Sequence, residues 1–100
     1  MIVVAGTIQL DPAKKAEATA AALEMMKATR AEPGNIEYAF TWDLAEEGLV
    51  RVFEQWQDQA SLEAHFDEPH MKAFIGKMGG LGIKGMDVKR YEIASVGPVR

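Results

Sequence analysis

The chain has 100 residues, of which 48% are hydrophobic and 26% are charged, and it contains no cysteine. This composition predicts one globular domain over residues 1–100, and the lack of cysteine excludes disulfides, thiolate catalysis and cysteine-ligated metal centres. The formal net charge of -4 argues against a nucleic-acid partner, because phosphate binding needs clustered lysine and arginine. The short apolar N-terminal stretch is unlike a signal peptide or membrane span, so we expect a cytoplasmic protein without a membrane partner.

The first part of the chain predicts a strand, a helix and a second strand. Residues 2–10 are apolar on both faces, as in a strand that is covered on both sides. Asp11 and Pro12 then open a helix that ends at Pro33 and Gly34, and its expected buried stripe consists of Ala16, Ala20, Leu23 and Met26 or Lys27. The next strand has a period of two, with an expected buried face of Ile36, Tyr38, Phe40 and Trp42.

After a turn at 44–48, the chain predicts a third strand and a broken helix. Residues 49–56 are again apolar on both faces. Helical spacing resumes at 58–66, and Pro69 interrupts it, because proline removes a helix hydrogen bond. Proline also fits well near a new helix start, so we expect a second helical segment at 70–78.

A glycine-rich segment separates this helix from the last expected strand at 88–93. Five glycines between Gly76 and Gly85 predict a mobile connection. Residues 80–85 match G-x-G-x-x-G, but a dinucleotide site requires this pattern to follow a strand and open a helix. We therefore interpret the segment as a connector.

The predicted order βαββαβ is that of an α+β, ferredoxin-like fold, in which a four-stranded antiparallel sheet carries its helices on one face. The first and third strands are central in this fold, and here they are the strands that are apolar on both sides. Something must cover the second face of the sheet, and an identical subunit is the economical choice. We therefore expect a homodimer.

Three strings of the second half carry more specific information: Glu54-Gln55-Trp56, Leu62-Glu63-Ala64-His65 and Pro69-His70-Met71-Lys72-Ala73-Phe74. Together with Glu32-Pro33-Gly34 they resemble the antibiotic biosynthesis monooxygenase family, most closely its small bacterial quinol monooxygenases. The resemblance spans about residues 2–93. It implies a dimeric α+β barrel that binds a small aromatic substrate between sheet and helices.

The resemblance also implies oxygenation by dioxygen without a metal or an organic cofactor. In such chemistry the substrate supplies the electrons, because a deprotonated quinol or phenol can reduce dioxygen directly. The protein then needs only a base and a dry, shaped cavity.

His65 and His70 are the candidate catalytic residues, because imidazole titrates near neutral pH and suits the removal of a hydroxyl proton. Either residue is equally consistent with helix packing, and the sequence leaves open which one acts as the base. Five residues apart with a proline between them, they lack the spacing of a helical metal pair. We therefore expect no metal.

Four residues are candidates for substrate binding. Trp56 is expected to form the pocket floor and stack on an aromatic ring, and Tyr38 to donate a hydrogen bond to a substrate oxygen. Met71 and Phe74 share a helical face that is expected to form a pocket wall. For each of the four, ordinary core packing is the alternative interpretation.

Three other functions stay open. Haem-degrading relatives share a tryptophan at the position of Trp56, but the sole asparagine here is Asn35 and no histidine follows His70. Conversion or breakdown of a small phosphorylated signalling sugar requires basic residues, for which Arg51 and Lys72 are candidates. A dimeric barrel that binds a small ligand without chemistry is the third, because fold does not fix function.

Overall fold

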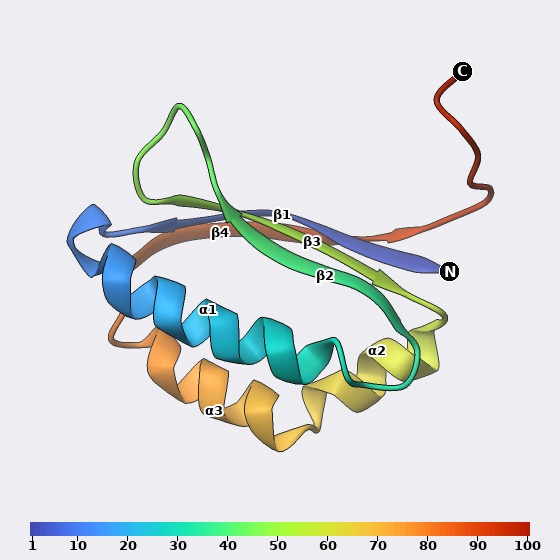
Figure 1. The fold of residues 1–100 in the computed structure, drawn as a ribbon, viewed down its shortest axis with the longest axis horizontal. Helices are drawn as coiled ribbons and strands as arrows, with labels where there is room; N and C mark the ends of the chain where they lie inside the picture. Colours follow the sequence, from blue (N-terminus) through green and yellow to red (C-terminus); the bar gives the residue numbers. More distant parts are fainter.

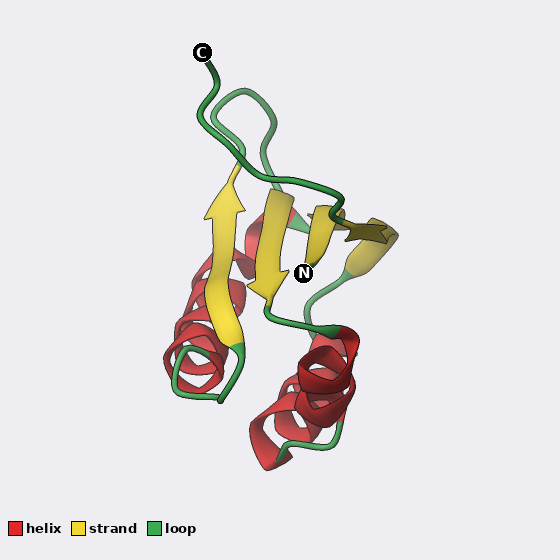
Figure 2. Cartoon of the chain, turned by 90° about the vertical axis from the view of Figure 1, so that its right-hand side faces the viewer, coloured by secondary structure: helices red, strands yellow, loops and turns green.

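The computed structural model describes residues 1–100 and places a four-stranded antiparallel sheet over a layer of helices (Figure 1). Figure 2 shows the two layers from the side. None of the helices is long and apolar enough to cross a membrane. In chain order the elements are β1 (Ile2–Leu10), the 3-10 helix η1 (Pro12–Lys14), α1 (Lys15–Thr29), β2 (Asn35–Trp42), β3 (Leu49–Trp56), α2 (Gln59–Phe66), α3 (Pro69–Met78) and β4 (Ile83–Glu92).

The sheet order is β2-β3-β1-β4, so the first and third strands are central. This arrangement confirms the predicted α+β, ferredoxin-like fold, including the break of the second helix before Pro69. Residues 79–82 lead from α3 into β4, as the interpretation of the glycine-rich segment as a connector requires.

The strand register brings residues of all four strands into one row on the helix-facing side of the sheet. Val4 of β1 lies opposite Glu54 of β3 and Arg90 of β4, and Glu54 in turn lies opposite Tyr38 of β2. Ile2 and Trp56 form the neighbouring inward-facing pair. A carboxylate and a phenol therefore meet at one end of the helix-facing side, in a row that also contains Arg90.

The buried stripe of α1 differs from the predicted one. The side chains that pack against the sheet are those of Ala18, Ala21, Met25 and Thr29, whereas Leu23 is 59% exposed. An alanine-rich helix offers little contrast between its faces, and the small side chains at 18 and 21 allow close approach to the sheet. The sequence therefore predicted the helix correctly and its orientation wrongly.

Two strand boundaries also differ from the prediction. The ladder between β2 and β3 is irregular between Asn35 and Glu37, and this irregularity leaves Ile36 52% exposed rather than buried. β4 begins at Ile83, five residues earlier than expected, because β1 supplies hydrogen-bonding partners for a polar, glycine-containing segment that looks like a loop in isolation. Part of the expected connection is thus regular strand.

The outer face of the sheet is less apolar than the sequence predicted. Phe53 of β3 pairs with Ala5, and Tyr91 of β4 pairs with Val3, but Gln55 and Lys89 stand in the same two rows, so apolar and polar side chains are mixed at this half of the face. In the next outward-facing row the residues are Thr41, Arg51, Thr7 and Asp87. The homodimer that would cover this face stays a prediction.

Candidate active site

A cavity of about 580 Å³ lies between the sheet and the helices α2 and α3. Its volume is in the range of small-molecule sites in proteins. Most of its wall is apolar, with Met71 and Phe74 of α3 facing Val4 and Val52 of the sheet. Three titratable side chains with little or no exposure to solvent also contribute to the wall: Tyr38, Glu54 and His65.

Glu54 is a buried carboxyl group whose pKa is raised to about 7. The main cause is burial, which disfavours the charged form, and the nearby Glu32 acts in the same direction. The indole N–H of Trp56 opposes them by donating a 3.0 Å hydrogen bond to Glu54 Oε1. The result is a carboxyl group that exchanges a proton near neutral pH.

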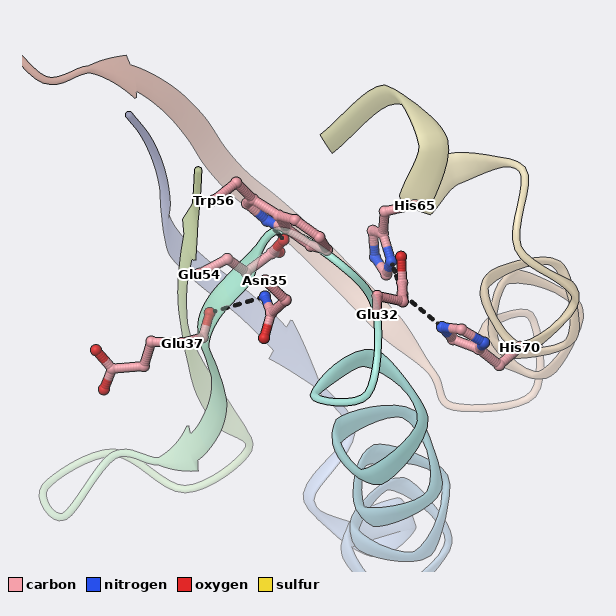
Figure 3. Close-up of polar contacts among 7 residues, drawn as sticks. All are labelled: Glu32, Asn35, Glu37, Glu54, Trp56, His65 and His70. Carbon is pink, nitrogen blue, oxygen red and sulfur yellow. Dashed lines mark hydrogen bonds and ion pairs between the residues drawn. The ribbon is translucent and has the colours of Figure 1, made fainter. Parts of the chain in front are cut away.

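Trp56 is fully buried and does not line the cavity. Its ring packs 4.9 Å from the ring of His65, centroid to centroid, and its N–H is used by Glu54 (Figure 3). The structure therefore places Trp56 behind the cavity wall, where it positions Glu54, and leaves it no free face on which a substrate ring can stack.

Tyr38 lines the cavity beside these groups. Its ring centroid lies 5.6 Å from that of His65, in an edge-on arrangement. Burial, followed by the charge of Glu54, raises the pKa of Tyr38 well above its usual range. A hydrogen bond with the Thr29 side chain acts in the opposite direction but does not offset these effects, so the hydroxyl keeps its proton.

The two histidines are joined by one carboxylate that the sequence analysis did not assign to the site. Glu32 Oε2 lies 2.6 Å from His65 Nδ1 and 2.7 Å from His70 Nε2, and Figure 3 shows Glu32 between the two rings. His65 is 1% exposed and lines the cavity through α2, whereas His70, at the start of α3, does not line it. His65 Nε2 has no hydrogen-bond partner within the protein.

Local sequence explains how these side chains come together. Glu32 follows α1, and Gly34 then turns the chain with a φ of +85° that other residues rarely adopt. A Cβ atom at Gly34 would lie 2.2 Å from Ser61 Oγ, so only glycine lets α2 approach this closely. Asp58 begins α2 by accepting a 2.8 Å hydrogen bond from the backbone N–H of Ser61, which orients the helix that carries His65.

Glu32, His65 and His70 are also the one group of side chains with the composition of a metal site. Their nearest ligand atoms all lie within 4.8 Å of one another. Sequence spacing alone gave no sign of this group, because the two histidines lie on different helices and the carboxylate comes from a third segment of the chain. The expectation that no metal binds therefore loses the spacing argument on which it rested.

The structure brings four of the six predicted site residues to one cavity: Tyr38, His65, Met71 and Phe74. His70 and Trp56 contact that site from behind its wall. Sequence reasoning missed Glu32 and Glu54, although both lie in the strings that carried the family resemblance. Glu54 also had a signal of its own, since it is a carboxylate between two apolar residues at inward-facing positions of a central strand.

The remaining hollows are less suited to chemistry. An apolar crevice of about 160 Å³ lies between α1 and the other end of the sheet, and no titratable side chain lines it. Arg51, a candidate for binding a phosphorylated substrate, pairs with Asp43 at 2.8 Å away from the cavity, and Lys72 is exposed outside it. The basic side chain that does reach the cavity is that of Arg90, because Lys89 lies on the outer face of the sheet, where it pairs with Asp87 at 2.7 Å.

Comparison with known proteins supports the family resemblance that was found in the sequence. Residues 1–77 match the family described as Antibiotic biosynthesis monooxygenase. An uncharacterised protein of Synechocystis is 39% identical over 93 residues, which are 93% of this chain but only 63% of that protein. YcnE of Bacillus subtilis, which is named as a candidate monooxygenase, is 31% identical over 94 residues, covering 94% of this chain and 99% of YcnE.

Solved structures show the same fold. A crystal structure described as a candidate antibiotic biosynthesis monooxygenase from Deinococcus radiodurans matches with a TM-score of 0.92 at 21% identity, over 100% of this chain and 99% of that one. A protein of the same description from Caulobacter crescentus matches with a TM-score of 0.86 at 27% identity, over 94% of this chain and 90% of that one.

Proposed function

Because this chain belongs to the antibiotic biosynthesis monooxygenase family, we propose that it is a cofactor-independent monooxygenase acting on a hydroquinone or another electron-rich aromatic. The observation that carries this proposal is the convergence of Tyr38, Glu54 and His65 on one end of an apolar cavity. An aromatic ring fits the apolar wall, and its hydroxyl group then meets groups that remove or donate protons.

The proposed reaction needs no electron donor other than the substrate. A hydroquinone and dioxygen give a hydroxylated quinone and water, so one oxygen atom enters the ring and the other leaves as water. Removal of a hydroxyl proton makes the ring electron-rich enough to reduce dioxygen. The enzyme contributes a base and a cavity that excludes water.

His65 is the proposed base. Its Nδ1 is directed at Glu32, which leaves Nε2 for the substrate hydroxyl, and the carboxylate stabilises the imidazolium that forms. Tyr38 donates a hydrogen bond to a substrate oxygen, and Glu54 exchanges a proton with the second oxygen near neutral pH. Met71 and Phe74 hold the ring. His70 acts through Glu32 rather than on the substrate.

Oxygen uptake with reduced naphthoquinols and polyketide phenols tests this proposal. His65→Gln is expected to lower the rate by about 10²–10⁴-fold, the usual contribution of a general base, while circular dichroism shows that the fold is retained. Lys72→Ala, on the exposed side of α3, is the matched control and should keep the wild-type rate. If uptake by the wild-type protein never exceeds autoxidation for any such substrate, the proposal is wrong.

One observation favours a second candidate function. Arg90 lines the cavity, and its positive charge suits an anionic ligand such as a small phosphorylated signalling molecule, either converted or merely bound. Calorimetry with phosphorylated sugars measures the affinity, and phosphorus NMR measures the turnover. Binding followed by turnover would support an isomerase or degradation enzyme, and binding without turnover would support a non-catalytic barrel.

We also propose that the outer sheet face forms a homodimer. The exposed aromatic side chains Phe53 and Tyr91 lie in adjacent rows of this face and give a second copy of the chain an aromatic surface to bury. Sedimentation equilibrium of the wild-type protein and of Phe53→Glu tests this proposal. A wild-type mass equal to that of one chain would contradict it.

A further inference from the structure

His65, Glu32 and His70 connect two separate hollows of the molecule. His65 lines the large cavity between the sheet and the helices. His70 lines a smaller opening of about 60 Å³ between α1 and α3, together with Glu24 and Lys77, and its side chain is 22% exposed. Glu32 lies between the two rings and is bonded to both. The three residues therefore reach from the proposed substrate site to the solvent side of the helical layer.

The geometry of the group favours shared protons over a bound metal. Both ring nitrogens lie 2.6–2.7 Å from the same oxygen, Glu32 Oε2, which is the length of a strong charge-assisted hydrogen bond. Two ligands of one zinc ion, with bonds of about 2.0–2.1 Å, lie roughly 3.3 Å apart in a tetrahedral site. A metal would therefore require the group to open.

A single carboxylate neutralises one imidazolium at a time. The ring centroids of His65 and His70 are 5.9 Å apart, so two positive rings repel each other across one negative charge. Protonation of one ring therefore weakens protonation of the other. Because each ring also has a second nitrogen directed away from Glu32, each is able to exchange a proton on its own side of the molecule.

We propose that His65, Glu32 and His70 form a coupled unit that carries one positive charge and passes it between the cavity and the outer opening; this role rests on the proposed function of the cavity. In the resting state the charge is on His70, because its side chain is 22% exposed, whereas that of His65 is 2% exposed and burial disfavours a charge. When a substrate hydroxyl gives its proton to His65 Nε2, the proton on His70 Nδ1 leaves to water. The carboxylate keeps both N–H bonds, and the positive charge now faces the substrate anion.

Both histidines return to their starting protonation states at the end of the reaction. When the reduced oxygen atom leaves as water, His65 returns its proton to it, and His70 takes one from solvent. Other charged or titratable groups surround each ring and are the same in every variant below. Around the cavity these are Tyr38, Glu54, Glu63 and Arg90, and around the outer opening they are Glu24 and Lys77.

Nitrogen-15 NMR of the two histidine rings, recorded against pH without substrate, tests the coupling independently of any activity. In the wild-type protein we expect the two rings to gain their protons in two steps separated by more than about one pH unit, as strongly interacting sites do. His70→Gln retains an N–H donor for Glu32 but removes the competing charge. It should move the protonation of His65 upward by roughly one pH unit.

Glu32→Gln should move the protonation of both rings to lower pH, because the shared negative charge is lost. Lys72→Ala, exposed on α3, should change neither ring. The inference is overturned if His65 titrates at the same pH with and without His70. It is also overturned if one equivalent of Zn²⁺ binds the wild-type protein and abolishes both titrations, since the group is then a metal site. Absence of oxygen uptake would contradict the proposed function but not the coupling.

Discussion

The two ends of the interface between sheet and helices use tryptophan differently. Trp42, at the end that contains Leu10 and Leu81, donates its indole N–H to the hydroxyl of Thr19 at 3.1 Å. Trp56, at the end that contains Tyr38 and His65, donates to the carboxyl group of Glu54 at 3.0 Å. A neutral partner makes the first end a packing region, whereas an ionisable partner makes the second end sensitive to pH. Both ends contain buried core residues, and the ionisable groups are what distinguishes the second end.

Among the variants that test this comparison, Leu81→Ala is expected to have the largest effect on the free energy of unfolding. Leu81 is buried among Ile8, Leu10 and Ala18, and its truncation leaves a cavity that costs about 2–5 kcal/mol. Urea denaturation measures this loss. Oxygen uptake per folded molecule should stay at the wild-type level, the reverse of the pattern expected for His65→Gln. Loss of activity in fully folded Leu81→Ala would show that the two ends are not separate.

Glu54→Gln tests whether the end of the sheet that contains Glu54 makes the free energy of unfolding dependent on pH. The pKa of Glu54 is about 7 in the folded protein, compared with an ordinary value of 4.5, so the folded state binds the proton more tightly than the unfolded chain. The free energy of unfolding therefore falls as pH rises from 4.5 to about 7, by about 3 kcal/mol from this group. Glutamine, which cannot ionise, should remove this contribution.

Urea denaturation at pH 4.5, 6 and 8 measures the difference between Glu54→Gln and the wild-type protein. A difference that stays constant over this range would mean that Glu54 titrates near its ordinary pKa and is not desolvated.

The smallest effect is expected from Trp56→Phe, which removes the N–H that stabilises ionised Glu54. The pKa of Glu54 should rise further, by up to about one unit, and the pH range over which stability is lost should move with it. Carbon-13 NMR of the glutamate carboxyl groups follows this shift. Trp42→Phe is the matched control, because its N–H serves only Thr19, and an equal shift there would refute the assignment.

The strand pattern was predictable because alternation and β-branched runs report directly on which faces are buried. The orientation of α1 was not, since alanine at 16, 18, 20 and 21 makes several faces nearly equivalent. Met71 and Phe74 followed from helical spacing. Glu32 could not be placed, because its partners lie 33 and 38 residues further along the chain and only the folded loop at Gly34 brings them together.

β1 and β4 are far apart in the sequence but pair in the sheet, with Ile2 opposite Glu92. Such non-local pairing slows folding, because a long loop must close before its contacts are gained. Met86, Val88 and Arg90 of β4 form one wall of the cavity. We therefore predict that this wall of the proposed binding site forms late in folding, which a stopped-flow comparison of tryptophan fluorescence and binding of an aromatic probe would reveal as a delay.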